Sequence, residues 1–335
     1  MIGLLRFARW MFPLAVCALA TASQGQTCLV ASDMEDATRT ALAHTAQHDF
    51  DLLASADVAG LKQVAAPSLA SDFSGIEAVV QENRASLNQV HATPRSPFLL
   101  KADKPEAGNN SQSGEFLCGV FGAHGQTADS AEFIIPNLPA GQYGIVMMDA
   151  AAKTPVTATF VLQLQNTDWK LAGLYVKTLQ VAGHDANWFA QQARGFAAKG
   201  ERRNAWLYFL EARDLAVPVQ FMTTQLSDKL FDESQAVKPT DLPDNNLVEL
   251  PVGTSKYQMT AIFPIGVEND IDVVVKYQSA DVSNTMKTFE ANQAVIKALL
   301  LKYPEFRDAF AGVVARAVEP SGKDYGSLVS MKDIK

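Results

Sequence analysis

The hydrophobic periodicity of this chain changes at Pro94 and Pro97. Before these prolines, residues 33–57, 58–67 and 76–90 carry apolar side chains at the three- and four-residue spacing that predicts amphipathic helices. After them, short runs rich in β-branched and aromatic residues are separated by turns that contain Gly or Pro, which predicts strands. These strands are expected at 98–100, 115–121, 131–135, 143–148, 156–165 and 169–176. Helices followed by an antiparallel meander predict an α+β domain.

The last two of these strands form a predicted hairpin, and residues 159–176 read TFVLQLQNTDWKLAGLYV. This segment resembles the final hairpin of the nuclear-transport-factor-2-like, or cystatin-like, superfamily, and its WKLAGLY stretch carries the resemblance. The resemblance covers about residues 33–181 and implies N-terminal helices on a curved antiparallel sheet, which together form a cone. We assign this cone domain to residues 30–182. The superfamily hosts isomerases, dehydratases, binding modules and assembly domains, so the fold alone does not identify an activity.

Two further helices are expected after the cone, at 187–199 and 202–216. This hairpin, assigned to 186–218, resembles a tetratricopeptide-type unit in its small and aromatic residues, namely Ala193, Phe196, Ala205, Phe209 and Ala212. One such unit cannot bury both of its faces and needs neighbours. We favour a packing element between two domains over a peptide-binding array. Its candidates for partner binding are Trp188, Trp206 and Tyr208, although aromatic residues at helical spacing commonly form a core.

A polar stretch with two prolines, PTDLPDNN at 239–246, marks a linker that we assign to residues 219–246. The C-terminal unit, 247–335, is expected to be a smaller α+β domain with the pattern β-β-α-β-β. Its strands are expected at 257–265, 271–278, 310–318 and 325–331. Its helix carries an apolar stripe of Met286, Phe289, Ile296, Leu300 and Tyr303. The pattern leaves open whether residues 306–317 form a strand or prolong the helix.

The first 22 residues have the three parts of a secretory signal peptide. Arg6 and Arg9 precede a short apolar run at 11–20, and Ala20-Thr21-Ala22 supplies small residues for cleavage. The run is shorter than the ~20 apolar residues that a membrane-spanning helix needs. We therefore expect cleavage near Ala22 and an exported protein, periplasmic or secreted, that does not span the membrane.

Export bears on the cysteines, because oxidising compartments allow disulfides. Cys17 lies within the signal segment, which leaves Cys28 and Cys118 in the mature chain. We expect these two to be linked, and the alternative is a pair of unpaired, buried thiols. Closing a loop of ~90 residues would stabilise the fold by about 4 kcal/mol in the chain-entropy account.

The chain is acidic, with a net charge of −8 at pH 7. Residues 1–22 carry two of its 28 basic residues and none of its 36 acidic ones, so cleavage would leave −10. Nucleic acids and anionic membranes bind clustered Lys and Arg, so this surface argues against both as partners. A protein or another component of the cell envelope is the partner class that we expect.

Motifs that depend on a fixed spacing are missing from the sequence. No serine lies in a GxSxG elbow, and no glycine-rich segment matches a phosphate-binding loop or a dinucleotide fingerprint, so we expect no cofactor. His44, His48 and Asp51 have the i, i+4, i+7 spacing that could seat a metal ion on a helix, but Thr45 stands where an HExxH motif has Glu. All three lie opposite the predicted apolar face of that helix, which consists of Leu42, Ala46, Phe50 and Leu53. We therefore expect a solvated surface there and no metal.

An acid or base in the cavity of the cone is harder to exclude, because apolar walls can tune its pKa by desolvation. The available candidates are Asp49, Asp72, Asp149 and His91. Two functions follow: an exported, non-catalytic binding or assembly protein of unknown ligand, or a small-molecule enzyme or carrier that uses the cone. A filled cone with an exposed apolar patch would favour the first, which we prefer. A large polar pocket with a perturbed carboxylate would favour the second.

Overall fold

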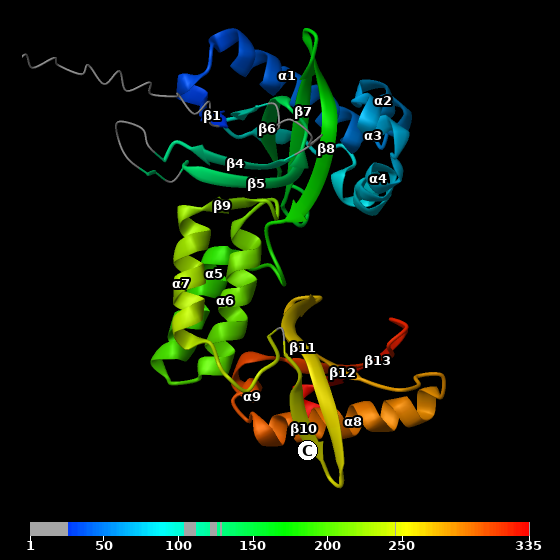
Figure 1. The fold of residues 1–335 in the computed structure, drawn as a ribbon. Helices are drawn as coiled ribbons and strands as arrows, with labels where there is room; N and C mark the ends of the chain where they lie inside the picture. Colours follow the sequence, from blue (N-terminus) through cyan, green and yellow to red (C-terminus); the bar gives the residue numbers. More distant parts are fainter. Residues whose placement is uncertain (1–25, 104–111, 121–125, 128, 245, 335) are drawn as a thin grey trace, which may run out of the picture.

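The computed structural model describes residues 26–103, 112–120, 126–127, 129–244 and 246–334. An N-terminal unit, three packed helices and a C-terminal unit follow one another along the molecule (Figure 1). Three sheets and their covering helices confirm the predicted α+β class. The expected signal segment lies outside the described residues. Among those residues, none of the helices has the length and apolar content needed to cross a membrane.

Four helices form the first layer of the N-terminal unit: α1 (Asp36–Ala54), α2 (Val58–Val64), α3 (Pro67–Ser71) and α4 (Ser74–Leu87). The expected apolar face of α1 is confirmed, because all four of its residues are buried: Leu42, Ala46, Phe50 and Leu53. This face packs tightly on the sheet beneath it, since a Cβ added at Gly144 would lie 2.1 Å from Leu42 Cδ2. Only glycine allows this helix so close to the sheet without rearrangement.

The second layer is a six-stranded antiparallel sheet, here called the main sheet. Its strands are β1 (Thr27–Leu29), β2 (Ala92–Pro94), β3 (Phe98–Ala102), β6 (Gly141–Ala150), β7 (Val156–Gln165) and β8 (Asp168–Thr178). They lie in the order β1-β3-β6-β7-β8, with β2 paired to β6. The expected hairpin is confirmed, because Gln165 pairs with Asp168 around a two-residue turn in which Asn166 has φ 55°. Asn is favoured in such turns because it tolerates the left-handed region.

The other strands of this unit form a second sheet, here called the side sheet. It consists of β4 (Gln112–Cys118), β5 (Ala131–Leu138) and β9 (Met222–Thr224) in that order. The expectation of one continuous meander is therefore wrong, because β3 pairs with β6 instead of β4.

The side sheet exists because β6 is apolar on both faces. Val146 and Met148 face the helices, whereas Ile145 and Met147 face the side sheet. A sheet with two apolar faces needs a cover on each. The unit is thus a three-layer stack of helices, main sheet and side sheet.

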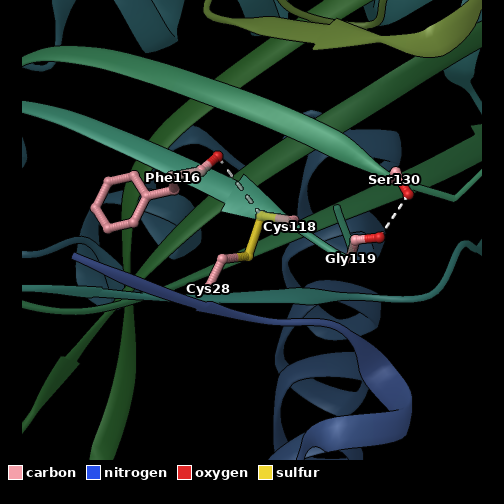
Figure 2. Close-up of a disulfide and its surroundings, with 5 residues drawn as sticks. All are labelled: Cys28, Phe116, Cys118, Gly119 and Ser130. Atoms are coloured by element: carbon pink, nitrogen blue, oxygen red, sulfur yellow. Dashed lines mark hydrogen bonds between the residues drawn. A yellow bond between two sulfur atoms is a disulfide. The ribbon is translucent and has the colours of Figure 1, made fainter. Parts of the chain in front are cut away.

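A disulfide joins the two sheets (Figure 2). Cys28 lies in β1 at the edge of the main sheet, Cys118 ends β4, and their Cα atoms are 5.0 Å apart. Cys118 has no exposed surface and belongs to the core between the sheets. Beside the bridge, the carbonyl of Gly119 (φ 65°) accepts a hydrogen bond from Ser130 Oγ at 2.8 Å. The expected Cys28–Cys118 pairing is confirmed.

Three helices follow the main sheet: α5 (Ala186–Ala198), α6 (Arg202–Ala216) and α7 (Gln225–Val237). The first two match the expected helices, but α7 and β9 occupy much of the segment 219–246 that we expected to be a linker. Thr224 and Ser227 form a capping box that starts α7, and Leu230 on its inner face is fully buried. Helix α7 was not expected from the sequence because its composition is mostly polar. Only one narrow face of the helix is buried, so the apolar periodicity that predicts a helix is weak.

The C-terminal unit places one long helix on a five-stranded sheet. Its elements are β10 (Val248–Val252), β11 (Ser255–Val267), β12 (Asp270–Gln278), α8 (Thr285–Lys302), α9 (Phe306–Ala309), β13 (Gly312–Val318) and β14 (Asp324–Ser330). The strands lie in sequence order, and only β12 and β13 run parallel. Residues 306–317, for which the sequence left strand and helix open, contain the short helix α9 followed by most of strand β13. The expected apolar stripe is wrong at its start, where Met286 is 73% and Phe289 47% exposed.

One core spans the three helices and the C-terminal unit. Tyr208 Oη donates to the Ala309 carbonyl oxygen at 2.5 Å, and its ring centroid lies 5.7 Å from that of Phe310. On the same helix, Arg203 forms ion pairs with Asp241 (2.6 Å) and Glu305 (2.5 Å). Helices α5 and α6 therefore have the neighbours that a lone hairpin needs, which favours their interpretation as a packing element.

Candidate partner-binding face

The aromatic residues that the sequence offers for partner binding lie mostly inside the protein. Trp206 and Tyr208 are each 3% exposed and belong to the shared core, so neither is accessible to a partner. Trp188 is half-buried and stacks on His184, with ring centroids 3.7 Å apart. The expectation of a docking surface at these three residues is thus wrong for two of them, because α7 and the C-terminal unit cover the face that the hairpin would otherwise expose.

The histidines and carboxylates considered for a metal or for catalysis are dispersed. His44, His48 and Asp51 are all exposed on α1, and Asp51 Oδ1 accepts a hydrogen bond from Gln47 (2.9 Å). Within the described ranges, no group of three or more His, Cys, Asp or Glu side chains is placed to hold a metal ion. Asp72 and His91 are also exposed.

Asp149 belongs to an ion pair. Arg95 donates to both of its carboxylate oxygens, at 2.7 and 2.8 Å, and Thr157 Oγ1 donates to Oδ1 at 2.8 Å. Burial by itself would raise the pKa of Asp149, but these hydrogen bonds and the Arg95 charge outweigh it and hold that pKa below its ordinary value. A carboxylate held in this way stays ionised and joins β2 to β6 and β7, so its role is structural.

The space between α1 and the main sheet is filled by side chains. Leu42 and Phe50 of α1 meet Phe160 and Leu162 of β7, and each of these four residues is 0% exposed. The interior of this unit is thus packed, and the groove that Asp49 adjoins lies at its rim, between α1 and the start of β8.

Apolar side chains are exposed instead on the outer face of the side sheet. Leu117 is 39% and Ile134 48% exposed, while Phe116 on the inner face is fully buried. The register places Glu115 opposite Ile134 and Leu117 opposite Glu132. Because successive side chains alternate between the faces of a strand, these four residues share one face, with two apolar and two acidic positions in diagonal arrangement.

This face continues onto α7 through β9. Thr223 Oγ1 donates to Glu132 Oε2 (3.1 Å), and Thr223 also lines a groove of about 410 Å³ between α6 and α7. Phe231 in this groove is 45% exposed, with the Arg213 guanidinium 4.7 Å from its ring centroid. We call the combined surface the α7–side-sheet face, defined by Glu115, Leu117, Glu132, Ile134, Asp228 and Phe231.

The electrostatics of this face are acidic. Burial raises the pKa of Asp228, and the neighbouring charges of Glu132 and Asp232 raise it further. Like charges that perturb one another in this way create a negative potential that attracts a basic partner. Arg213 lies within the groove beside the Phe231 ring and adds one positive charge to this otherwise acidic surface.

Part of this face was within reach of sequence reasoning. The sequence predicts a strand at 115–121, but its unbroken apolar run Phe116-Leu117-Cys118 does not indicate which face is exposed. The exposure of Phe231 on a helix could not be predicted, because Phe231 lies in the segment that we expected to be a linker. Leu226 is 41% exposed but lies on the opposite flank of α7 from Phe231 by helical geometry, so it is not part of the face.

Comparison with models of protein families, with curated proteins and with solved structures finds no match to this chain.

Proposed function

We propose that this protein is an exported, non-catalytic binding or assembly protein whose α7–side-sheet face contacts a protein or another envelope component. The observation that carries the proposal is the exposure of Leu117 and Ile134 on the side sheet and of Phe231 in the neighbouring groove, which Thr223 connects to that sheet. Soluble proteins seldom leave grouped apolar side chains exposed unless they bind something. Two features support export. The disulfide is typical of proteins in oxidising compartments, and the signal-like N-terminus is typical of chains that are directed there.

The acidic residues of the face indicate what kind of partner fits. Glu115 and Glu132 alternate with the apolar positions of the side sheet, and Asp228 adjoins the groove. A partner segment that carries both basic and apolar side chains would complement this pattern, with the charges increasing the rate of association and the apolar contacts most of the affinity. The net negative charge of the chain acts in the same direction.

We also propose that the N-terminal unit is a cystatin-like cone and that α5 and α6 form a tetratricopeptide-like hairpin. In the cone, four helices pack on an antiparallel sheet that ends in the β7–β8 hairpin, as the resemblance implies. The side sheet is an addition to that plan. In this proposal it is the addition, rather than the interior of the cone, that provides the binding surface.

The alternative function, a small-molecule enzyme or carrier, receives support from one observation. Burial raises the pKa of Asp49 to about 6, and this residue adjoins a groove at the rim of the cone. A carboxylate tuned in this way is a common feature of functional sites, but structural groups show it too.

The test is site-specific photo-crosslinking in intact cells that express and export the protein. A photoreactive residue in place of Ile134 or Phe231 should crosslink to one defined protein or envelope component. The matched control is Leu301, which is 85% exposed on α8 and lies outside the face. The variant Ile134→Asp should abolish the Phe231 crosslink without changing the melting temperature, whereas Leu301→Asp should leave it intact. Equal crosslinking from position 301, or none from the face, would contradict the proposal.

A further inference from the structure

A second groove, of about 740 Å³, lies between one face of α1 and the tip of the β7–β8 hairpin. Its chemistry comes from Thr45, His48 and Asp49 on α1 and from Trp169 and Lys170 on β8. The helix supplies its residues at spacings of three and four, and the hairpin turn brings the start of β8 alongside them. None of these residues belongs to the α7–side-sheet face.

Asp49 is the unusual member of this groove. It is 0% exposed, and His48 Nδ1 lies 3.2 Å from its Oδ1, but its Oδ2 has no hydrogen-bond partner. Leaving a buried polar atom unpaired costs about 1–3 kcal/mol, so such atoms often mark a place where a ligand or water supplies the missing bond. Burial raises the pKa of Asp49 to about 6, against the opposing effects of His48 and Lys170. At pH 7.5 the group is therefore mostly an anion with an unused acceptor.

Lys170 supplies the opposite charge. It is half-buried, and among the described residues no acidic side chain lies within ion-pair distance of it. Asp36 at the other end of the groove is already paired with Arg39 at 2.6 Å. The remaining titratable groups of the lining, His44 and Asp168, are exposed. A buried carboxylate with one unpaired oxygen and a half-buried lysine thus line one groove, and the charge of Lys170 acts on the titration of Asp49.

Trp169 supplies an apolar wall. Its indole is half-buried and packs against the core between the helices and the main sheet. Sites for small molecules combine such an apolar surface with a few placed polar groups.

We propose that this groove binds a small zwitterionic molecule of the amino-acid class, with its ammonium group on Asp49, its acidic group on Lys170 and its apolar part against Trp169. A ligand with only an amine would leave Lys170 unpaired and meet its repulsion. A ligand with only an acid would meet the negative charge of Asp49. The His48 ring has to move for the ammonium to reach Asp49, and its side chain is 54% exposed, so solvent leaves room for that rotation.

The test is calorimetric titration of the full mature chain at pH 7.5 with the twenty common amino acids. Each hit is then compared with its amine and its acid, as phenylalanine is with 2-phenylethylamine and 3-phenylpropionate. We expect at least one amino acid to bind and both of its singly charged relatives to bind at least tenfold more weakly. Asp49→Asn and Lys170→Met should each weaken binding at least tenfold. The control Asp51→Asn, on an exposed position of the same helix, should not.

The pH dependence identifies the carboxylate. Because the ammonium binds the ionised form of Asp49, affinity should fall about tenfold per pH unit below pH 6, and this dependence should disappear in any binding retained by Asp49→Asn. No heat with any of the twenty amino acids, equal binding of an amine or acid alone, or unchanged affinity in both variants would overturn the proposal. If Asp49→Asn does not fold, Lys170→Met decides the outcome.

Discussion

Removing the disulfide should destabilise the N-terminal unit more than any other part of the protein. The perturbation is the double substitution Cys28→Ala and Cys118→Ala, which avoids placing a polar hydroxyl in the core that surrounds Cys118. The two cysteines are separated by 90 residues in the sequence, and releasing a loop of that length costs about 4–5 kcal/mol of loop-closure entropy. The loop contains α1 to α4 together with β2, β3 and most of β4, so the loss falls on the three-layer stack.

Hydrogen exchange read by mass spectrometry is the appropriate assay, because it reports each part of the chain separately. In the double variant, the opening free energy of amides in β5, β6 and β7 should fall by about 4 kcal/mol, or to zero if the unit has less than that to lose. Amides of β11 and β12 serve as the internal control, since they belong to the other core and should change little. Reductant should reproduce the effect in the wild type and have no effect on the variant.

A loss below about 1 kcal/mol in the N-terminal unit would refute this reasoning, because it would mean that packing alone holds the two sheets together. An equal loss in β11 and β12 would also refute it, because the three units would then unfold as one.

Three further substitutions test the packing and electrostatics. Asp49 holds its proton more tightly in the folded chain (pKa about 6) than at its ordinary value of 3.8. The unfolding free energy of the wild type should therefore fall by about 3 kcal/mol relative to Asp49→Asn as the pH rises from about 3 to about 7, and then level off. The unfolding free energies are measured by urea titration at several pH values in that range. If they change with pH by the same amount in the wild type and in Asp49→Asn, the raised pKa of this buried carboxylate is contradicted. Gly144→Ala should cost about 1–3 kcal/mol in thermal unfolding, because the new Cβ would meet Leu42 at 2.1 Å. An unchanged melting temperature would show that α1 can move away without loss. Tyr208→Phe leaves the Ala309 carbonyl without its 2.5 Å partner, and exchange in α6 and α9 should reveal a loss of about 1–2 kcal/mol. No loss there would mean that water replaces the hydroxyl.

Features that depend on neighbouring residues could be predicted from the sequence. The apolar face of α1, the two-residue turn at Asn166-Thr167 and four of the five strands of the C-terminal unit follow from periodicity and turn chemistry, whereas the edge strand β10 was not expected. The Cys28–Cys118 pair could be predicted by elimination, since Cys17 falls in the expected signal segment.

The surface and the groove were decided by contacts between distant segments. The pairing of Ala131 with Thr224 joins residues that are far apart in the chain, and nothing in either segment specifies the other. The groove at Asp49 also depends on distant segments. The helical periodicity of α1 predicts which side of the helix carries Asp49, but the other wall of the groove is formed by the β7–β8 hairpin, more than 100 residues later in the chain. Periodicity tells which side of a strand or helix is apolar, but not what will cover it. That depends on long-range packing, because burial is a property of the partner surface as much as of the residue itself.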